Sequence, residues 1–376
     1  MNICFFGGYR PEYPRNAILR RGLELAGADV LECRVRPSHK FWLRYPLLLG
    51  RYALSLKKTG RQASPGQSFL FVPEFCQKDV AIARVISRLT SRPVIFDPLA
   101  SRYETKILDR RIWSEKSAAA RWNASIDRRA FRRADFILAD TAAHKAYYSE
   151  ENGIPAEKIE ILPVGFDDRI WNDTLPDKTP SSVFVVMFFG SFLPLHGADV
   201  IMETARLVAA RDPSVEFRII GSGQTFPAAR KIAESAGLRN VRFEGWLPHR
   251  ELARRVSAEA DLCLGIFGKS GKARRVVPHK VFQAMAAGKP VLTLRTPAAE
   301  EFFRHGDHVY FCDEPDPVSL AAAVLDLKSD SGLREGIARR GCALVREKFN
   351  PRALGQMLMD HLKKRFERGN QRRMAR

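Results

Sequence analysis

The residues best placed to do chemistry lie between two apolar segments, at residues 261–294. A loop and a short helix in this stretch carry five cations: Lys269, Lys272, Arg274, Arg275 and Lys280. We expect the helix to begin at Pro278, where the missing N–H costs little, and to end at Gly288. Cations beside a helix N-terminus, between two parallel strands, are suited to binding phosphate.

Apolar segments alternate with helical periodicity along the chain. The first strand, 1–6, runs into Gly7-Gly8, and further strands are expected at 28–35, 69–73, 94–97, 136–139 and 159–163. After a turn-rich segment at 163–182, interpreted as a linker, the alternation restarts with strands at 183–189, 215–220, 240–244, 261–266 and 291–294. Such alternation is typical of parallel sheets in α/β proteins.

This pattern predicts an α/β fold with two Rossmann-like domains that face a cleft. The N-terminal domain is expected over 1–165 and the C-terminal domain over 180–345. The remaining residues, 346–376, are expected to form a helix that returns to the first domain, followed by a basic tail.

Several segments together resemble the family 4 (group 1) glycosyltransferases of the GT-B fold. Residues 283–291, QAMAAGKPV, are similar to the E-A-M-A-x-G-x-P-V helix of that family. Its G-R-x-x-x-x-K-G segment is matched by 186–208, and its strand ending in G-x-G by 217–225. Weaker similarities cover 241–253, 296–324 and 132–171.

The resemblance implies a nucleotide-sugar site in the C-terminal domain. The residues that it places there are Gly190, His196, Gly197, Gly221, Gly223, Trp246, Leu247, Lys272, Arg275, Lys280, Gln283 and Glu301. On the other domain, Gly7 and Gly8 would let an acceptor or phosphate approach the backbone. Asp97, at the end of a strand, is the candidate polar group near the transferred sugar.

Four of these positions depart from the family pattern. The family has Arg, Lys, Glu and Glu where this chain has Ser191, His196, Arg275 and Gln283. The surrounding glycines and prolines are intact, so we interpret the site as a variant donor site whose missing cations come from the loop at 269–275 and from Lys280. The alternatives are a solvated basic loop, a Lys280 that faces solvent, and a Gln283 without a ligand.

The other candidates also have structural alternatives. Gly7-Gly8 could be a tight turn, Asp97 a cap or turn residue, and Glu301 a charge at a helix N-terminus.

The resemblance implies transfer of a sugar from a nucleotide diphosphate to an envelope polysaccharide or lipid-linked acceptor. Members of this family mostly retain the anomeric configuration and need no metal, and no D-x-D loop stands out here.

A non-catalytic GT-B-like binding protein is the alternative that the four departures leave open. A nucleic-acid-binding protein would explain the charge, but the chain carries no module of that kind and we expect no nucleic-acid partner. An NAD enzyme would need a complete G-x-G-x-x-G.

The net charge of +20 predicts an anionic partner. Residues 33–73 contain no acid, and within them 38–58 combine aromatics, leucines and cations. We interpret 38–58 as an interfacial segment that docks on an anionic membrane surface, the alternative being a core helix with a basic solvent face. Scattered cysteines, no signal peptide and no long apolar run predict a cytoplasmic protein, peripheral on the inner face of the plasma membrane.

Overall fold

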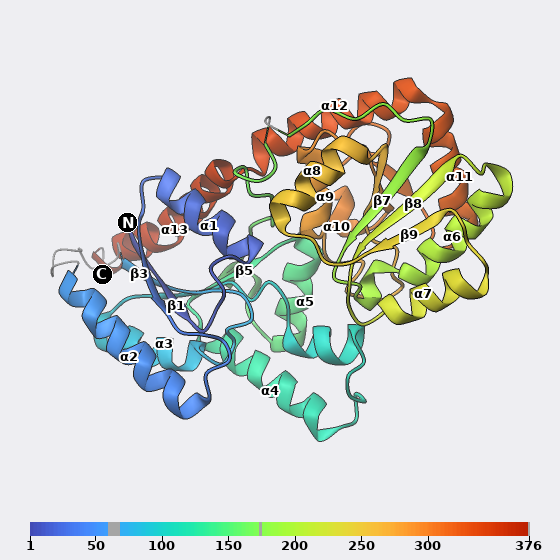
Figure 1. Ribbon diagram of the computed structural model, residues 1–376. Coiled ribbons are helices and arrows are strands. Elements are labelled where there is room, and N and C mark those ends of the chain that lie inside the picture. Colours follow the sequence, from blue (N-terminus) through green and yellow to red (C-terminus); the bar gives the residue numbers. More distant parts are fainter. Residues whose placement is uncertain (59–67, 173–174, 375–376) are drawn as a thin grey trace. The chain divides into compact units, whose positions relative to one another are not determined.

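The computed structural model describes residues 1–58, 68–172 and 175–374 (Figure 1). The chain forms two compact units, Met1–Pro163 with Asn350–Arg376 and Val164–Phe349. Each unit contains a six-stranded parallel sheet, as the restart of strand–helix alternation predicts. None of the described helices is both long enough and apolar enough to span a bilayer.

The first sheet has the strand order β2-β1-β3-β4-β5-β6. Its strands are β1 (Asn2–Gly7), β2 (Asp29–Arg34), β3 (Ser68–Val72), β4 (Val94–Phe96), β5 (Phe136–Ala139) and β6 (Ile159–Ile161). The helices of this unit are α1 (Pro14–Leu25), α2 (Phe41–Lys58), α3 (Val80–Thr90), α4 (Ala118–Arg133), α5 (Ala142–Asn152) and α13 (Pro351–Met374). Two short turns complete it, the π-helix Glu104–Asp109 and the 3-10 helix Ala156–Lys158.

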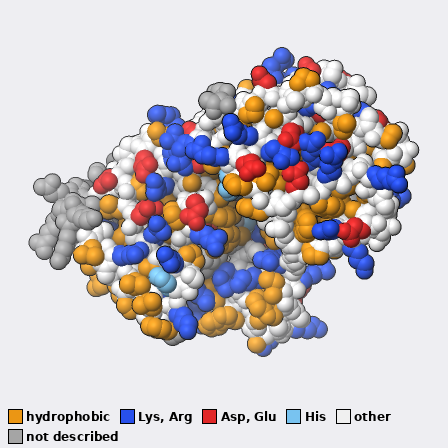
Figure 2. Space-filling view, in the orientation of Figure 1, with side chains coloured by type: hydrophobic (Ala, Val, Ile, Leu, Met, Phe, Trp, Pro, Cys, Tyr) orange, Lys and Arg blue, Asp and Glu red, His pale blue; other side chains and the backbone are white. Residues whose placement is uncertain are grey.

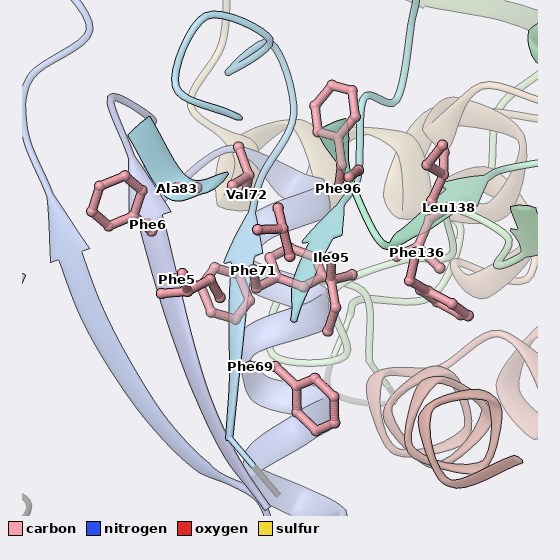
Figure 3. Close-up of a cluster of buried hydrophobic side chains, with 14 of the residues drawn as sticks. Phe5, Phe6, Phe69, Phe71, Val72, Ala83, Ile95, Phe96, Phe136 and Leu138 are labelled. Atoms are coloured by element: carbon pink, nitrogen blue, oxygen red, sulfur yellow. The ribbon is translucent and has the colours of Figure 1, made fainter. Parts of the chain in front are cut away.

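The core of the first unit consists of side chains from the central strands. The residues of β3 and β4 are buried throughout, because helices cover both faces of a parallel sheet. Figure 1 shows α1 and α13 on one side of this sheet and α2 and α3 on the other. Phenylalanines from several strands meet in the interior (Figure 3), and the rings of Phe5 and Phe71 stack with their centroids 4.5 Å apart.

The second sheet has the order β12-β11-β10-β7-β8-β9. Its strands are β7 (Phe184–Gly190), β8 (Val215–Gly221), β9 (Val241–Glu244), β10 (Leu262–Leu264), β11 (Val291–Leu294) and β12 (Tyr310–Cys312). The helices are α6 (Ala198–Arg211), α7 (Phe226–Ser235), α8 (His249–Glu259), α9 (His279–Ala286), α10 (Pro297–Glu300), α11 (Pro317–Ser329) and α12 (Ser331–Lys348), with a 3-10 turn at Pro194–His196.

The segment interpreted as a linker differs from that expectation, because the residues after Pro163 belong to the second unit. Trp171 is buried and stacks on Phe189 of β7 at 6.0 Å between ring centroids. The amide of Thr179 donates to the carbonyl of Ala258 at the end of α8. Turn-forming residues therefore mark an irregular segment here, but one that packs on the second sheet.

Helices α1 and α13 touch through their backbones. A Cβ atom at Gly22 would overlap the carbonyl oxygen of Pro351, and one at Gly355 would overlap the carbonyl oxygen of Gly22. Two glycines at the crossing point thus let the last helix lie directly on the first.

We expect Gly355→Ala to lower the free energy of unfolding by about 1–3 kcal/mol, the range for overpacking a tight contact. Chemical denaturation of the two proteins measures this difference. Gly50→Ala is the matched control, because a Cβ at Gly50 of α2 meets nothing within 4 Å. Equal stability of the two variants would contradict the proposed close crossing of α1 and α13.

Candidate functional site

The carboxyl ends of β7 and β8 touch through glycine. Gly190 and Gly221 are register partners, with φ angles of 145° and 128° that other residues rarely adopt. A Cβ at Gly221 would overlap the carbonyl oxygen of Gly190, and one at Gly223 would lie 2.6 Å from the carbonyl oxygen of Ser191. These glycines let the backbone segments at the two strand ends pack directly against one another.

The turn after β7 presents His196. The Leu193 amide donates to Nδ1 of His196 at 3.2 Å, so the neutral ring carries its proton on Nε2. Burial lowers the pKa of His196 well below its ordinary value, and the charges of Lys280 and Lys272 lower it further. The ring is therefore a neutral donor. Gly197 follows it and begins α6, where a Cβ would lie 2.5 Å from the carbonyl of Phe267.

Lys280 brings an ammonium group to the same strand end. This side chain of α9 is only 6% exposed, so it does not face solvent. Its Nζ lies 3.7 Å from the ring centroid of Phe188, and a Cβ at Gly190 would lie 3.0 Å from Nζ and 3.6 Å from Cε1 of His196. Lys280 and His196 thus converge on Gly190.

The Lys280 ammonium has no hydrogen-bond partner among the described residues. Burial lowers its pKa well below the ordinary value. An unpaired charge is costly to bury, and the contact with the Phe188 ring offsets only part of that cost. The arrangement therefore favours an anion beside Gly190, because such a ligand would stabilise the charged amine.

The basic loop before α9 splits into buried and exposed cations. Lys272 is 8% exposed and lies close enough to lower the pKa of His196, and Arg275 is half-buried with its guanidinium against Gly271. Lys269 and Arg274 are exposed. The loop is therefore not simply a solvated surface segment.

The remaining candidates of the second unit lie on α9, after β9 and at the end of α10. Gln283 is buried one turn after Lys280 on α9, whereas Trp246 and Leu247 follow β9, with the Trp246 ring 60% exposed. Glu301 is exposed at the end of α10.

In the first unit, the chain's own side chains occupy the Gly7-Gly8 turn. The Gly8 amide donates to Oδ2 of Asp79 at 2.8 Å, and Arg44 of α2 pairs with the same carboxylate. The Arg44 guanidinium lies directly over Gly8, where a Cβ would meet it at 2.5 Å. This arrangement favours the tight-turn interpretation, and ligand binding by Gly7 and Gly8 stays a prediction.

Asp97 lies at the end of β4 in a buried ion pair. Its two oxygens accept from Nε and Nη2 of Arg15 at 2.8 and 3.3 Å, and Arg15 also donates to the carbonyl of Pro163. Asp97 is 1% exposed and Arg15 is fully buried. The geometry favours a structural role for this carboxylate, and a catalytic role for Asp97 stays a prediction without geometric support.

A charged cluster inside the first unit was not predicted from the sequence. Nδ1 of His144 contacts Oδ1 of Asp140 at 2.5 Å, and its Nε2 contacts Oε2 of Glu104 at 2.9 Å. Burial opposes the imidazolium, but the two carboxylates outweigh it and raise the pKa of His144 to about 9. The only sequence signal was the Asp-x-x-x-His spacing of 140 and 144, since Glu104 comes from a distant π-helix.

Both halves of the chain match family models of known proteins. Residues 3–165 match the model described as "Glycosyl transferase 4-like domain", and residues 183–330 match "Glycosyl transferases group 1". The lipopolysaccharide core biosynthesis glycosyltransferase LpsD of Rhizobium meliloti is 25% identical over 51% of this chain and 52% of its own length. The putative colanic acid biosynthesis glycosyltransferase WcaL of Salmonella typhimurium is 26% identical over 61% of this chain and 56% of its own length. These alignments span little more than half of either relative.

Among solved structures, the fold is similar to that of Anabaena Alr3699/HepE in complex with UDP-glucose. The TM-score is 0.68, with 17% sequence identity over 97% of this chain and all of that one. At this identity the likeness establishes the architecture, two Rossmann-like units of the GT-B type.

We expect the His144 cluster to make stability fall at alkaline pH. The folded pKa of about 9 lies above the ordinary value of 6.5, so the stabilisation is complete below pH 6.5 and is lost as pH rises through 9. The loss is roughly 3 kcal/mol, from the 1.36 kcal/mol that one pKa unit represents.

Denaturant unfolding between pH 6.5 and 9.5 measures this loss. His144→Gln should unfold more readily at pH 6.5 and show a flatter pH profile, whereas His249→Gln on α8 should keep the profile of the unmodified protein. Parallel profiles for the unmodified protein and His144→Gln would contradict the assignment.

Proposed function

Because the chain belongs to the group 1 glycosyltransferases and has their GT-B fold, we propose that it transfers a sugar from a nucleotide-diphosphate donor to a glycan acceptor of the cell envelope. The observation that carries the proposal is the ammonium of Lys280 beside Gly190, for which the described part of the chain offers no hydrogen-bond acceptor. A donor diphosphate is the anion that this position suits. The complex of Alr3699/HepE with UDP-glucose supports a UDP-sugar as the donor class.

The chemistry follows from how the site stabilises the leaving group. Transfer breaks the bond between the sugar and the diphosphate, so negative charge grows on the phosphate oxygen. Lys280, the Nε2–H of His196 and the N-terminus of α9 are donors positioned in advance for that charge, which is how an oxyanion is stabilised. Lys272 and Arg275 add positive potential from the loop, where the family pattern has a glutamate in place of Arg275.

The buried Gln283 suits the sugar or ribose hydroxyls of the donor. An amide has one acceptor oxygen, whereas a carboxylate has two, so the contact is retained in a weaker form than in the family pattern. Retention of the anomeric configuration and independence of metal ions are implied by the resemblance and stay predictions.

The acceptor side of the proposal rests on the relatives and on charge. LpsD and WcaL are named for lipopolysaccharide core and colanic acid biosynthesis, both envelope glycans. We infer that this chain likewise acts on an envelope polysaccharide or its lipid-linked precursor, at the cytoplasmic face of the membrane.

Helix α2 supports docking on an anionic bilayer. One side of it is anchored in the first unit by Leu48 and Tyr52, which are buried. The other side exposes apolar side chains, with Trp42 and Leu54 more than 60% exposed and Leu43 and Leu49 at least 40%. Figure 2 shows hydrophobic and basic side chains interleaved over this region. A core helix with a basic solvent face would not expose this apolar surface; the side chain of Phe41 lies outside the described residues.

We expect Lys280→Met to weaken UDP binding by about 1.5–3 kcal/mol, the scale of a hydrogen bond to a charged group, without unfolding the protein. Arg275→Ala should have an effect of the same sign. Titration calorimetry with UDP measures the affinity of both variants. Arg274→Ala, which removes an exposed cation from the same loop, is the control.

Unchanged affinity for UDP in the Lys280 and Arg275 variants would show that these residues are not part of the donor site. No UDP or GDP binding by the unmodified protein would favour a non-catalytic role.

We expect the double variant Trp42→Ser, Leu43→Ser to lose most of its co-sedimentation with phosphatidylglycerol vesicles at low salt. Each substitution removes apolar surface that would be buried in the bilayer. Burial of such surface contributes about 25 cal/mol per Å² to the free energy of binding. Trp122→Ser, at another exposed tryptophan of the first unit, is the control and should bind normally. Equal binding by all three proteins would contradict docking through α2.

A further inference from the structure

A strongly basic hollow lies between the end of β2 and helix α2. Its volume is about 480 Å³, and its lining consists of Arg34, Arg36, His39 and Arg51 with the single acid Glu32. We propose that this hollow binds the phosphate group of a lipid-linked acceptor. The proposal rests on the proposed function, because it assigns a part of the acceptor to a site on the first unit.

The lining carries more positive charge than the acids of the described residues neutralise. Glu32 accepts a hydrogen bond from the hydroxyl of Tyr9 at 3.2 Å and pairs with Arg20 at 3.3 Å, outside the lining. Its other oxygen is 4.0 Å from Nε of Arg34. Three arginines thus share a fraction of one carboxylate, so the lining keeps positive charge that suits an anion.

The backbone holds these groups in place. Arg51 of α2 donates to the carbonyl oxygen of Arg34, which ties the helix to the end of the strand. The Val35 amide donates to the carbonyl of Gly7, and the His39 amide donates to the carbonyl of Arg36, so the connecting loop is fixed at both ends. These bonds fix the loop and the Arg51 side chain, and planar guanidinium groups match the geometry of phosphate oxygens.

His39 adds an unsatisfied ring nitrogen to the same hollow. Its Nδ1 is buried and has no hydrogen-bond partner among the residues that the structure describes. Buried polar atoms are nearly always paired, so the His39 ring would gain a missing hydrogen bond if a ligand in the hollow drew it outward.

The position of the hollow favours a phosphate carried on a lipid. Its helical wall, Arg51, lies one turn before Leu54 on α2 and two residues after Leu49, and both leucines are exposed. A helix that rests on the bilayer through these leucines holds Arg51 at the depth of the head groups, where lipid phosphates lie. The nucleotide donor has its own cations in the second unit, at Lys272 and Lys280.

The experiment compares two vesicle types of equal nominal charge, phosphatidylcholine containing farnesyl diphosphate and phosphatidylcholine containing phosphatidylglycerol. The unmodified protein should bind the diphosphate vesicles about tenfold more tightly, because charge-assisted hydrogen bonds to a diphosphate are the strong class. The double variant Arg34→Gln, Arg36→Gln should lose this preference. Arg51 is left intact because it fixes the loop.

The control removes two exposed arginines elsewhere on the first unit, Arg88→Gln with Arg129→Gln, and should keep the preference. Equal losses in the two double variants would show unspecific attraction and overturn the proposal. So would an unmodified protein that shows no preference, or complete displacement from the vesicles by equimolar inorganic pyrophosphate, which would indicate a free phosphate as the ligand. UDP binding, measured in parallel, separates the proposed function from the proposed acceptor site. If the unmodified protein does not bind UDP, the result counts against the proposed function. If it binds UDP but shows no preference for the diphosphate vesicles, only the acceptor site is overturned.

Discussion

Lys280 carries an ammonium group into the interior of the second unit, to a point where no described residue accepts a hydrogen bond from it. The surrounding elements make that position possible. Gly190 leaves room for Nζ, the ring of Phe188 lies beneath it, and the turn that ends at His196 keeps a neutral ring beside the cation. A site assembled in this way is incomplete without an anion, and the proposed donor diphosphate supplies one.

In the first unit, the buried charges of Arg15 and His144 are paired with carboxylates of the same unit. Arg15 and Asp97 satisfy one another at the end of β4, and the imidazolium of His144 lies between two carboxylates. Such pairs are costly to break but need no ligand. The contrast with Lys280 is why we place the donor anion in the second unit and regard Asp97 as structural.

Periodicity and glycine spacing predicted the two sheets and the strand ends at Gly190 and Gly221, because these features depend on local sequence. They could not predict contacts between distant segments. The burial of Lys280, which sequence alone left open, depends on the packing of α9 against β10, β11 and α12, which lets its side chain reach the Phe188 ring of β7. The pairing of Glu104 with His144, and the covering of Gly8 by Arg44, likewise join residues about 40 positions apart.

The most direct test of the account is the pKa of Lys280 itself, followed by NMR of lysine side chains labelled with ¹³C at Cε, with Lys280→Met to assign the signal. The amine should titrate with a pKa well below its ordinary value of 10.5 in the free protein, and UDP should raise this pKa because the diphosphate stabilises the charged form. An amine that titrates near 10.5 and does not respond to UDP would contradict the account.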